Sequence, residues 1–231
     1  MTEESTPEGA DIAGQTIAVL GGTGDQGRGL ARRFALAGHT VLIGSRSAER
    51  AEKAARELTE GESARLDVRG LDNTAAAAEG DIVIVAVPWD GHRELLEGLV
   101  GPLAGKIVVD CVNPLGFDGK GPFALDVPEG SAAQQAALIL TGSTVTAAFH
   151  HVSAVVLLDP SVDEVALDVL VLGEDRAATD AVRALAERIP GVRGVFGGRL
   201  RNAHQVEALT ANLIAVNRRY KTHAGVRVTG I

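Results

Sequence analysis

Residues 17–46 read IAVLGGTGDQGRGLARRFALAGHTVLIGSR, and this stretch decides the fold. An apolar run of strand length leads without a spacer into a glycine turn. A helical pattern follows as far as Gly38, which is placed to end the helix, and a second apolar run begins at Thr40. This strand–turn–helix–strand order is typical of a unit that binds a dinucleotide.

The turn carries the spacing G-x-G-x-x-G at Gly22, Gly24 and Gly27. Because the chain holds 28 glycines in 231 residues, about 0.4 such matches arise by chance. The spacing alone is therefore weak, and the flanking strands and helix give it weight. Gly22 and Gly24 are suited to a tight turn close to a pyrophosphate, and Gly27 to close packing of helix on strand. The helix N-terminus would then face the phosphates with its free N–H groups. The alternative is a glycine turn that holds no ligand.

The second strand of the unit ends at Ser45 and Arg46, and these two residues predict which dinucleotide binds. An NAD site carries an acid here to bind the ribose 2′-hydroxyl. A hydroxyl and a guanidinium favour a 2′-phosphate instead, and therefore NADP. Ser47 is placed to cap the next helix, which brings Arg50 within reach of the same phosphate.

The rest of the chain alternates strand and helix patterns. Apolar strands in such an alternation predict a doubly wound parallel sheet of the Rossmann type. Ligands bind such sheets beyond the carboxyl ends of the strands, which directs attention to Trp89 and Asn113. We expect further strands at 64–69, 81–87, 106–110, 144–148, 165–171 and 192–196, helices at 48–58, 71–79, 95–103, 132–140, 176–188 and 202–220, and a loop at 116–130.

Three segments are predicted: a disordered lead-in (1–14), an NADP-binding Rossmann domain (15–155) and a smaller C-terminal α/β domain (156–231). Apolar residues recur at spacings of three and four along 206–220, a stripe that closes either a core or a dimer.

Composition narrows the class of protein. A net charge of −8 argues against general nucleic-acid binding, and no apolar run is long enough to span a membrane. A single cysteine, Cys111, and the lack of a secretory signal favour the cytoplasm. Residues 199–231 are nevertheless locally basic, which indicates either a solvated helix face or a site for an anionic ligand.

The sequence shows neither a metal-ligand pattern nor a nucleophile motif. His150 and His151 are adjacent; they either polarise a carbonyl group or simply form hydrogen bonds at a strand end. Hydride transfer mainly requires two rings held in contact in a dry cleft. A cofactor motif without an acid–base constellation fits that chemistry.

Five segments together resemble the NADPH-dependent coenzyme F-420 reductase family: 21–31 (GGTGDQGRGLA), 44–46 (GSR), 87–89 (VPW), 148–154 (AFHHVSA) and 200–210 (LRNAHQVEALT). The resemblance covers nearly everything after residue 15. It implies reversible hydride transfer between NADP(H) and the deazaflavin coenzyme F-420, in a cleft between two domains and usually in a homodimer.

By position, the resemblance assigns roles to individual residues. Thr23, Gly24, Asp25 and Gln26 would hold the pyrophosphate, and Ser45, Arg46 and Arg50 the 2′-phosphate. Val87, Asn113 and Ala154 would line the nicotinamide, and His150 and the segment around Leu209 would face the deazaflavin. Apart from the resemblance, Trp89 follows the end of a predicted strand, where it is either buried at the edge of the core or a wall of the nicotinamide pocket. An NADP-dependent imine or ketone reductase and a non-catalytic NADP sensor are the alternatives. An imine or ketone reductase of this kind would have a longer helical dimerisation domain than the C-terminal segment predicted here.

Overall fold

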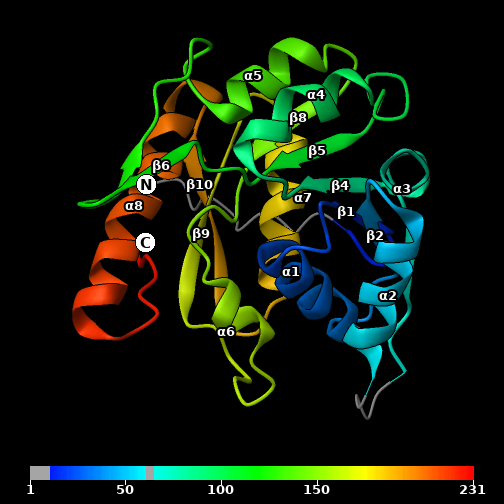
Figure 1. The fold of residues 1–231 in the computed structure, drawn as a ribbon, viewed down its shortest axis with the longest axis horizontal. Coiled ribbons are helices and arrows are strands. Elements are labelled where there is room, and N and C mark those ends of the chain that lie inside the picture. Colours follow the sequence, from blue (N-terminus) through cyan, green and yellow to red (C-terminus); the bar gives the residue numbers. More distant parts are fainter. Residues whose placement is uncertain (1–10, 61–64) are drawn as a thin grey trace, which may run out of the picture.

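An eight-stranded sheet runs through the molecule in the order β10-β9-β8-β5-β4-β1-β2-β3 (Figure 1). It is seen in a computed structural model that describes residues 11–60 and 65–231. The strands of the sheet are β1 (Ile17–Leu20), β2 (Val41–Ser45), β3 (Val68–Asp72), β4 (Ile82–Val85), β5 (Ile107–Asp110), β8 (Thr144–Ala147), β9 (Leu167–Gly173) and β10 (Val192–Gly198).

The pairing confirms the predicted doubly wound parallel sheet. β1 lies between β2 and β4 and is parallel to both, with Ile17 opposite Val41 and Ile82. The chain therefore reverses its direction of winding beside β1, which is where such folds bind ligands. At the other end of the sheet β9 runs antiparallel to its neighbour β8, and β10 then pairs parallel to β9.

Helices cover both faces of the sheet because the strand residues are buried on both sides. Ile17 and Val19 point into one core and Ala18 and Leu20 into the other. The first core is completed by α1 (Asp25–Leu36), α2 (Ala48–Thr59), α6 (Ala154–Leu158) and α7 (Arg176–Glu187). The second contains α3 (Asn73–Glu79), α4 (His92–Glu97), α5 (Ala132–Ile139) and the start of α8 (Ala203–Tyr220).

Several predicted boundaries need correction. Residues 116–130, expected as a loop, contain a hairpin of β6 (Leu115–Asp118) and β7 (Gly121–Ala124). Its Gly and Pro content suited a loop, but it is a two-stranded ribbon packed on α8. The helix expected at 95–103 is α4, which begins at His92, and the strand expected at 64–69 is β3 at 68–72. Short helix α6 was not expected, because five residues are too few to show a helical period.

The C-terminal part continues the main sheet through β9 and β10. Asp168 on β9 anchors the final residues of the chain, since its buried carboxylate binds the Arg193 and Arg227 guanidinium groups and the Val228 N–H. The hydrogen bonds of Arg193, against the opposing effect of burial, lower the pKa of Asp168 to about 2. The domain boundary at residue 155 stays a prediction. The predicted lead-in lies largely outside the described residues, and of its last four, Ile12 is buried.

Candidate functional site

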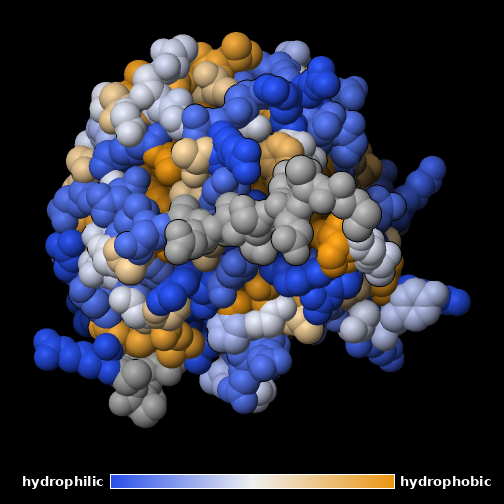
Figure 2. Space-filling view, turned by 180° about the vertical axis from the view of Figure 1, so that it is seen from behind, coloured by the Kyte–Doolittle hydropathy of each residue, from blue (hydrophilic) through white to orange (hydrophobic). Residues whose placement is uncertain are grey.

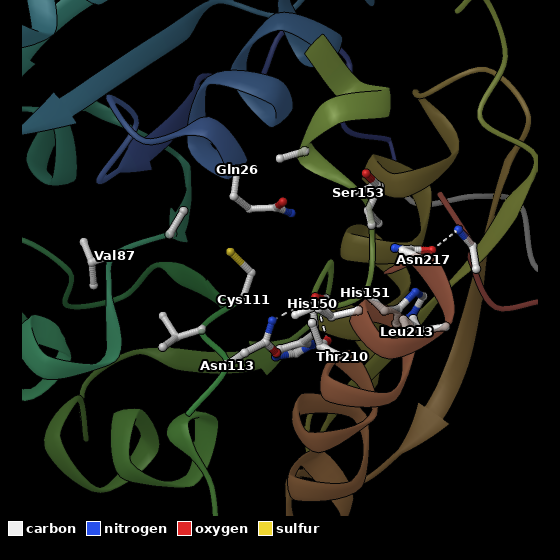
Figure 3. Close-up of a pocket in the computed structure, with 16 residues that line it drawn as sticks. Gln26, Val87, Cys111, Asn113, His150, His151, Ser153, Thr210, Leu213 and Asn217 are labelled. Atoms are coloured by element: carbon white, nitrogen blue, oxygen red, sulfur yellow. Dashed lines mark hydrogen bonds between the residues drawn. The ribbon is translucent and has the colours of Figure 1, made fainter. Parts of the chain in front are cut away.

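A cleft of about 360 Å³ opens beyond the carboxyl ends of β4, β5 and β8, with one wall formed by α8 (Figure 3). Of the residues that the resemblance assigns to a ligand, five line it: Gln26, Val87, Asn113, His150 and Ala154. The other lining residues are Ala86, Cys111, Val112, His151, Val152, Ser153, Thr210, Leu213, Ile214, Asn217 and Ala224.

The glycine turn is as tight as the motif predicts. A Cβ at Gly27 would stand 2.7 Å from the Gly22 Cα and 2.8 Å from the Gly21 carbonyl oxygen, so no larger residue fits without moving backbone. Gly24 is the N-cap of α1 and makes no side-chain cap, which leaves the N–H groups of the first helical turn to a ligand. The structure therefore fits a pyrophosphate at this helix end.

At the end of β2, Ser45 is buried while Arg46 and Arg50 are exposed. Ser47 caps α2 as expected, because its Oγ accepts the Arg50 N–H at 3.3 Å. Within residues 11–60 and 65–231, neither the Arg46 nor the Arg50 guanidinium forms an ion pair with an acidic side chain. Both cations are thus open to an external anion.

The backbone after β8 is held by side chains from three other parts of the chain. The carbonyl oxygen of His150 accepts from Asn113 Nδ2 at 2.9 Å and from Thr210 Oγ1 at 3.0 Å. The neighbouring carbonyl of Phe149, a residue with a φ of 65°, accepts from Gln26 Nε2 at 3.2 Å. These bonds fix a strained turn and join the walls of the cleft.

The imidazoles of His150 and His151 are buried, and within the described chain none of their ring nitrogens has a hydrogen-bond partner. Burial lowers the pKa of each to about 4. Both rings are therefore neutral near pH 7. Buried polar atoms normally have partners, so these nitrogens are placed to bond a ligand.

Cys111 also lines the cleft, but it is not poised as a nucleophile. Its thiol donates to the Val85 carbonyl oxygen at 3.1 Å. Burial, together with the nearby Asp110 carboxylate, raises the pKa of this thiol. The group stays protonated, whereas nucleophilic attack requires the thiolate.

The remaining candidates lie around the cleft rather than in its lining. Trp89 is half-buried and packs its ring on His92, with the ring centroids 5.5 Å apart. Leu209 is half-buried on α8. Thr23 is half-buried, and Gly24 and Asp25 are exposed at the start of α1.

The face of α8 that lines the cleft is formed by Thr210, Leu213, Ile214 and Asn217. The resemblance pointed to the segment around Leu209, but sequence reasoning did not assign the last three of these residues to the cleft. The apolar stripe on this helix drew attention to core or dimer packing. Of that stripe, Val206 is buried, whereas Val216 and Tyr220 are 37% and 72% exposed. The signal that could have found the cleft face is the polar pair Thr210 and Asn217, seven residues apart on one side of a helix.

In the basic segment 199–231, some of the guanidinium groups are already paired with acidic side chains of the protein. Arg199 forms an ion pair with Glu174, and Arg227 pairs with Asp168. Arg218, Arg219 and Lys221 are exposed at the end of α8.

Comparison with known proteins finds relatives that match this chain over almost its whole length. The family described as "NADP oxidoreductase coenzyme F420-dependent" matches residues 16–114. The chain is 41% identical over 221 residues to F420-dependent NADP reductase of Methanothermobacter thermautotrophicus, covering 93% of this chain and 95% of that one. It is 40% identical over 223 residues to the protein of the same name from Methanocaldococcus jannaschii, covering 93% of this chain and 98% of that one.

A crystal structure from Arthrobacter sp. FB24, provisionally named an F420-dependent NADP-reductase, superposes with a TM-score of 0.77 at 27% identity. The match covers 94% of this chain and 100% of that one. The architecture described above is therefore shared over essentially the whole length.

Proposed function

The chain belongs to the coenzyme F-420-dependent NADP oxidoreductase family, and from this premise we propose how its cleft works. The protein is an oxidoreductase that transfers hydride reversibly between NADP(H) and the deazaflavin coenzyme F-420. The observation that carries the proposal for the site is the meeting of Gln26, Asn113 and His150 around one cleft (Figure 3). These residues come from the dinucleotide unit, from the segment after β5 and from the turn after β8.

The NADP phosphates are assigned to the first third of the chain. The turn formed by Gly22, Thr23, Gly24, Asp25, Gln26 and Gly27 receives the pyrophosphate at the α1 N-terminus. Ser45, Arg46 and Arg50 receive the 2′-phosphate. The exposed guanidinium groups of Arg46 and Arg50 support this assignment, since charge-assisted bonds to phosphate are among the stronger ones in proteins.

The nicotinamide ring is assigned to the wall formed by Val87, Asn113 and Ala154, with Trp89 behind it. Asn113 Oδ1 is buried and, among the described residues, lacks a hydrogen-bond partner. An amide N–H of the nicotinamide carboxamide is the group that would satisfy it.

The deazaflavin is assigned to the opposite side, next to His150 and Leu209. A neutral His150 imidazole donates one hydrogen bond and accepts another, which suits the carbonyl and N–H groups of a deazaflavin edge. The role of the residues in this cleft is to hold two rings face to face at roughly 3–3.5 Å and to exclude water. No side chain has to carry a proton in that step.

The family resemblance also supports three further proposals, on the oligomeric state, the location and the domain boundary. The protein forms a homodimer, resides in the cytoplasm, and completes the cleft with a C-terminal domain that begins near residue 156. Exposed apolar side chains lie on the β6–β7 hairpin (Phe117, Phe123) and on α8 (Val216, Tyr220), and these two elements pack together, which supports a second subunit at this edge. From behind, the molecule is largely hydrophilic with separate hydrophobic patches (Figure 2). Among the residues that the structure describes, no helix combines the length and apolar character needed to cross a bilayer.

A spectrophotometric assay tests the activity. Addition of NADPH to purified protein and coenzyme F-420 should bleach the deazaflavin band near 420 nm, whereas an ordinary flavin should stay oxidised. An imine or ketone reductase would leave the band unchanged and oxidise NADPH with its own substrate. A sensor would bind NADP without turnover.

A further inference from the structure

A buried charged cluster lies behind the cleft and is formed by His92, Asp110, Gln135 and Glu207. His92 begins α4, Asp110 ends β5, and the other two lie on α5 and α8. All four side chains are almost completely removed from solvent. Buried charges are costly unless they are paired, so the pairing in this cluster is informative.

Both ring nitrogens of His92 face acceptors. Nε2 lies 2.6 Å from Asp110 Oδ2, and Nδ1 lies 2.9 Å from Gln135 Oε1. The Gln135 amide is oriented by its other end, because its Nε2 donates to Glu129 Oε2 at 3.2 Å. A ring with an acceptor at each nitrogen carries two protons, so His92 is an imidazolium. Burial disfavours this charge, but the Asp110 carboxylate outweighs it and raises the pKa of His92.

Asp110 connects His92 to the wall of the cleft. Its second oxygen, Oδ1, accepts the backbone N–H of Val112 at 3.0 Å. This bond turns the chain at the end of β5 just where residues 111–113 become the cleft wall. Asn113 at the end of that turn donates to the carbonyl of His150.

Glu207 attaches α8, which forms the opposite wall of the cleft, to α5, the helix that carries Gln135. Its carboxylate accepts the N–H groups of Ala132 and Ala133 in the first turn of α5, at 3.0 and 3.2 Å. Burial raises the pKa of Glu207 to about 7, against the effect of these two bonds. Less than one turn farther along α8, Thr210 donates to the carbonyl of His150. The start of α5 therefore supports both side chains that hold the His150 carbonyl. It supports Asn113 through Gln135, His92 and Asp110, and it supports Thr210 through Glu207.

We infer that His92 is a positioning residue for hydride transfer, whose imidazolium fixes the turn at 110–113 and thereby the distance between the two rings. The inference rests on the proposed function, since it concerns the same cleft. His92 is buried and does not line the cleft, and the proposed phosphate contacts lie at the other end of the dinucleotide. Loss of His92 should therefore slow hydride transfer without weakening NADPH binding.

The kinetic experiment compares His92→Leu, which has no donor, with His92→Gln, which retains one. Single-turnover reduction of coenzyme F-420 should slow by about 10- to 100-fold in His92→Leu and by less in His92→Gln. The dissociation constant of NADPH should stay within about twofold in both. His204→Leu, at an exposed position of α8, is the control. A folded His92→Leu protein with the parent rate, or one that loses NADPH affinity in parallel with rate, would overturn the inference.

A spectroscopic arm tests the protonation without any turnover. In ¹⁵N-histidine NMR of the intact protein at pH 7, the signal that is missing from His92→Gln should have the shifts of two protonated ring nitrogens. One unprotonated nitrogen would contradict the imidazolium. If His92→Leu does not fold, Gln135→Ala replaces it, and a parent rate in that variant counts against the inference. Should the parent protein itself transfer no hydride, the proposed function fails, while the NMR result still decides the state of His92.

Discussion

The side chain of Asn113 donates from Nδ2 to the backbone carbonyl oxygen of His150, at 2.9 Å. The bond links the end of β5 to the turn after β8, 37 residues later in the chain. Thr210 reaches the same oxygen from α8. One carbonyl group therefore ties together the elements that we assign to the nicotinamide and to the deazaflavin.

Replacement of Asn113 by Ala should separate these elements. The variant loses the bond to His150 and the Oδ1 acceptor proposed for the carboxamide. The rate of hydride transfer in a single turnover should fall by roughly 10- to 100-fold, because small errors in ring position are costly. Asn212→Ala, at an exposed position of α8, should retain the parent rate. An Asn113→Ala rate equal to that of the control would show that this bond does not position the rings.

Arg46→Ala tests the choice of dinucleotide. Removal of a charge-assisted bond worth roughly 1.5–3 kcal/mol should weaken NADP by about 10- to 150-fold and leave NAD almost unchanged. Titration calorimetry with both dinucleotides measures the difference. Arg56→Ala is the control, since Arg56 is exposed on the same helix as Arg50 and pairs with Glu52 at 3.8 Å. Equal losses for NADP and NAD would show that Arg46 does not bind the 2′-phosphate.

Gly27→Ala tests the glycine turn. The added Cβ meets backbone atoms at 2.7 and 2.8 Å, so either α1 or the turn must shift. We expect the free energy of unfolding to drop by about 1–3 kcal/mol and NADP affinity to drop with it. Urea unfolding and calorimetry report the two effects. Gly101→Ala has open space around its Cβ and should change neither quantity.

The buried histidines predict an acid-sensitive fold. Burial lowers the pKa of His151 to about 4 from a value of 6.5 in an exposed side chain. The unfolded chain thus binds a proton more readily, and stability that is complete above pH 6.5 is lost as the pH falls toward 4. For His151 alone the loss between pH 7 and pH 5 is about 2 kcal/mol.

His151→Gln should therefore lose about that much less stability than the parent over the same interval. Urea unfolding at pH 7 and at pH 5 gives the comparison, with His204→Gln as the control at an exposed position. Parallel losses in His151→Gln and the parent would contradict a neutral, buried His151.

The sequence predicted the dinucleotide unit well because its signals are local. A glycine turn between an apolar run and a helical pattern specifies β1, α1 and β2 without knowledge of the rest of the chain. The Ser47 cap was likewise local, and the structure confirms it, since its hydroxyl accepts the N–H of Arg50, three residues later. The β6–β7 hairpin escaped prediction because it is stabilised by packing on α8, far away in sequence.

The cleft was predictable only in part for the same reason. Asn113 and His150 could be proposed from strand ends and from resemblance, but nothing in the sequence links them to Thr210. The pairing of His92 with Asp110 joins a helix start and a strand end that carry no shared motif. Such contacts depend on the register of the folded sheet.

Transfer of a label is the most direct test of the central claim. NADPH deuterated at the transferable position of its nicotinamide should be incubated with the protein and coenzyme F-420 in ordinary water. The account predicts that one deuterium appears at carbon 5 of the reduced deazaflavin, because hydride passes directly between rings held in contact. Reduced deazaflavin without deuterium, or deuterium retained in NADPH after turnover, would contradict it.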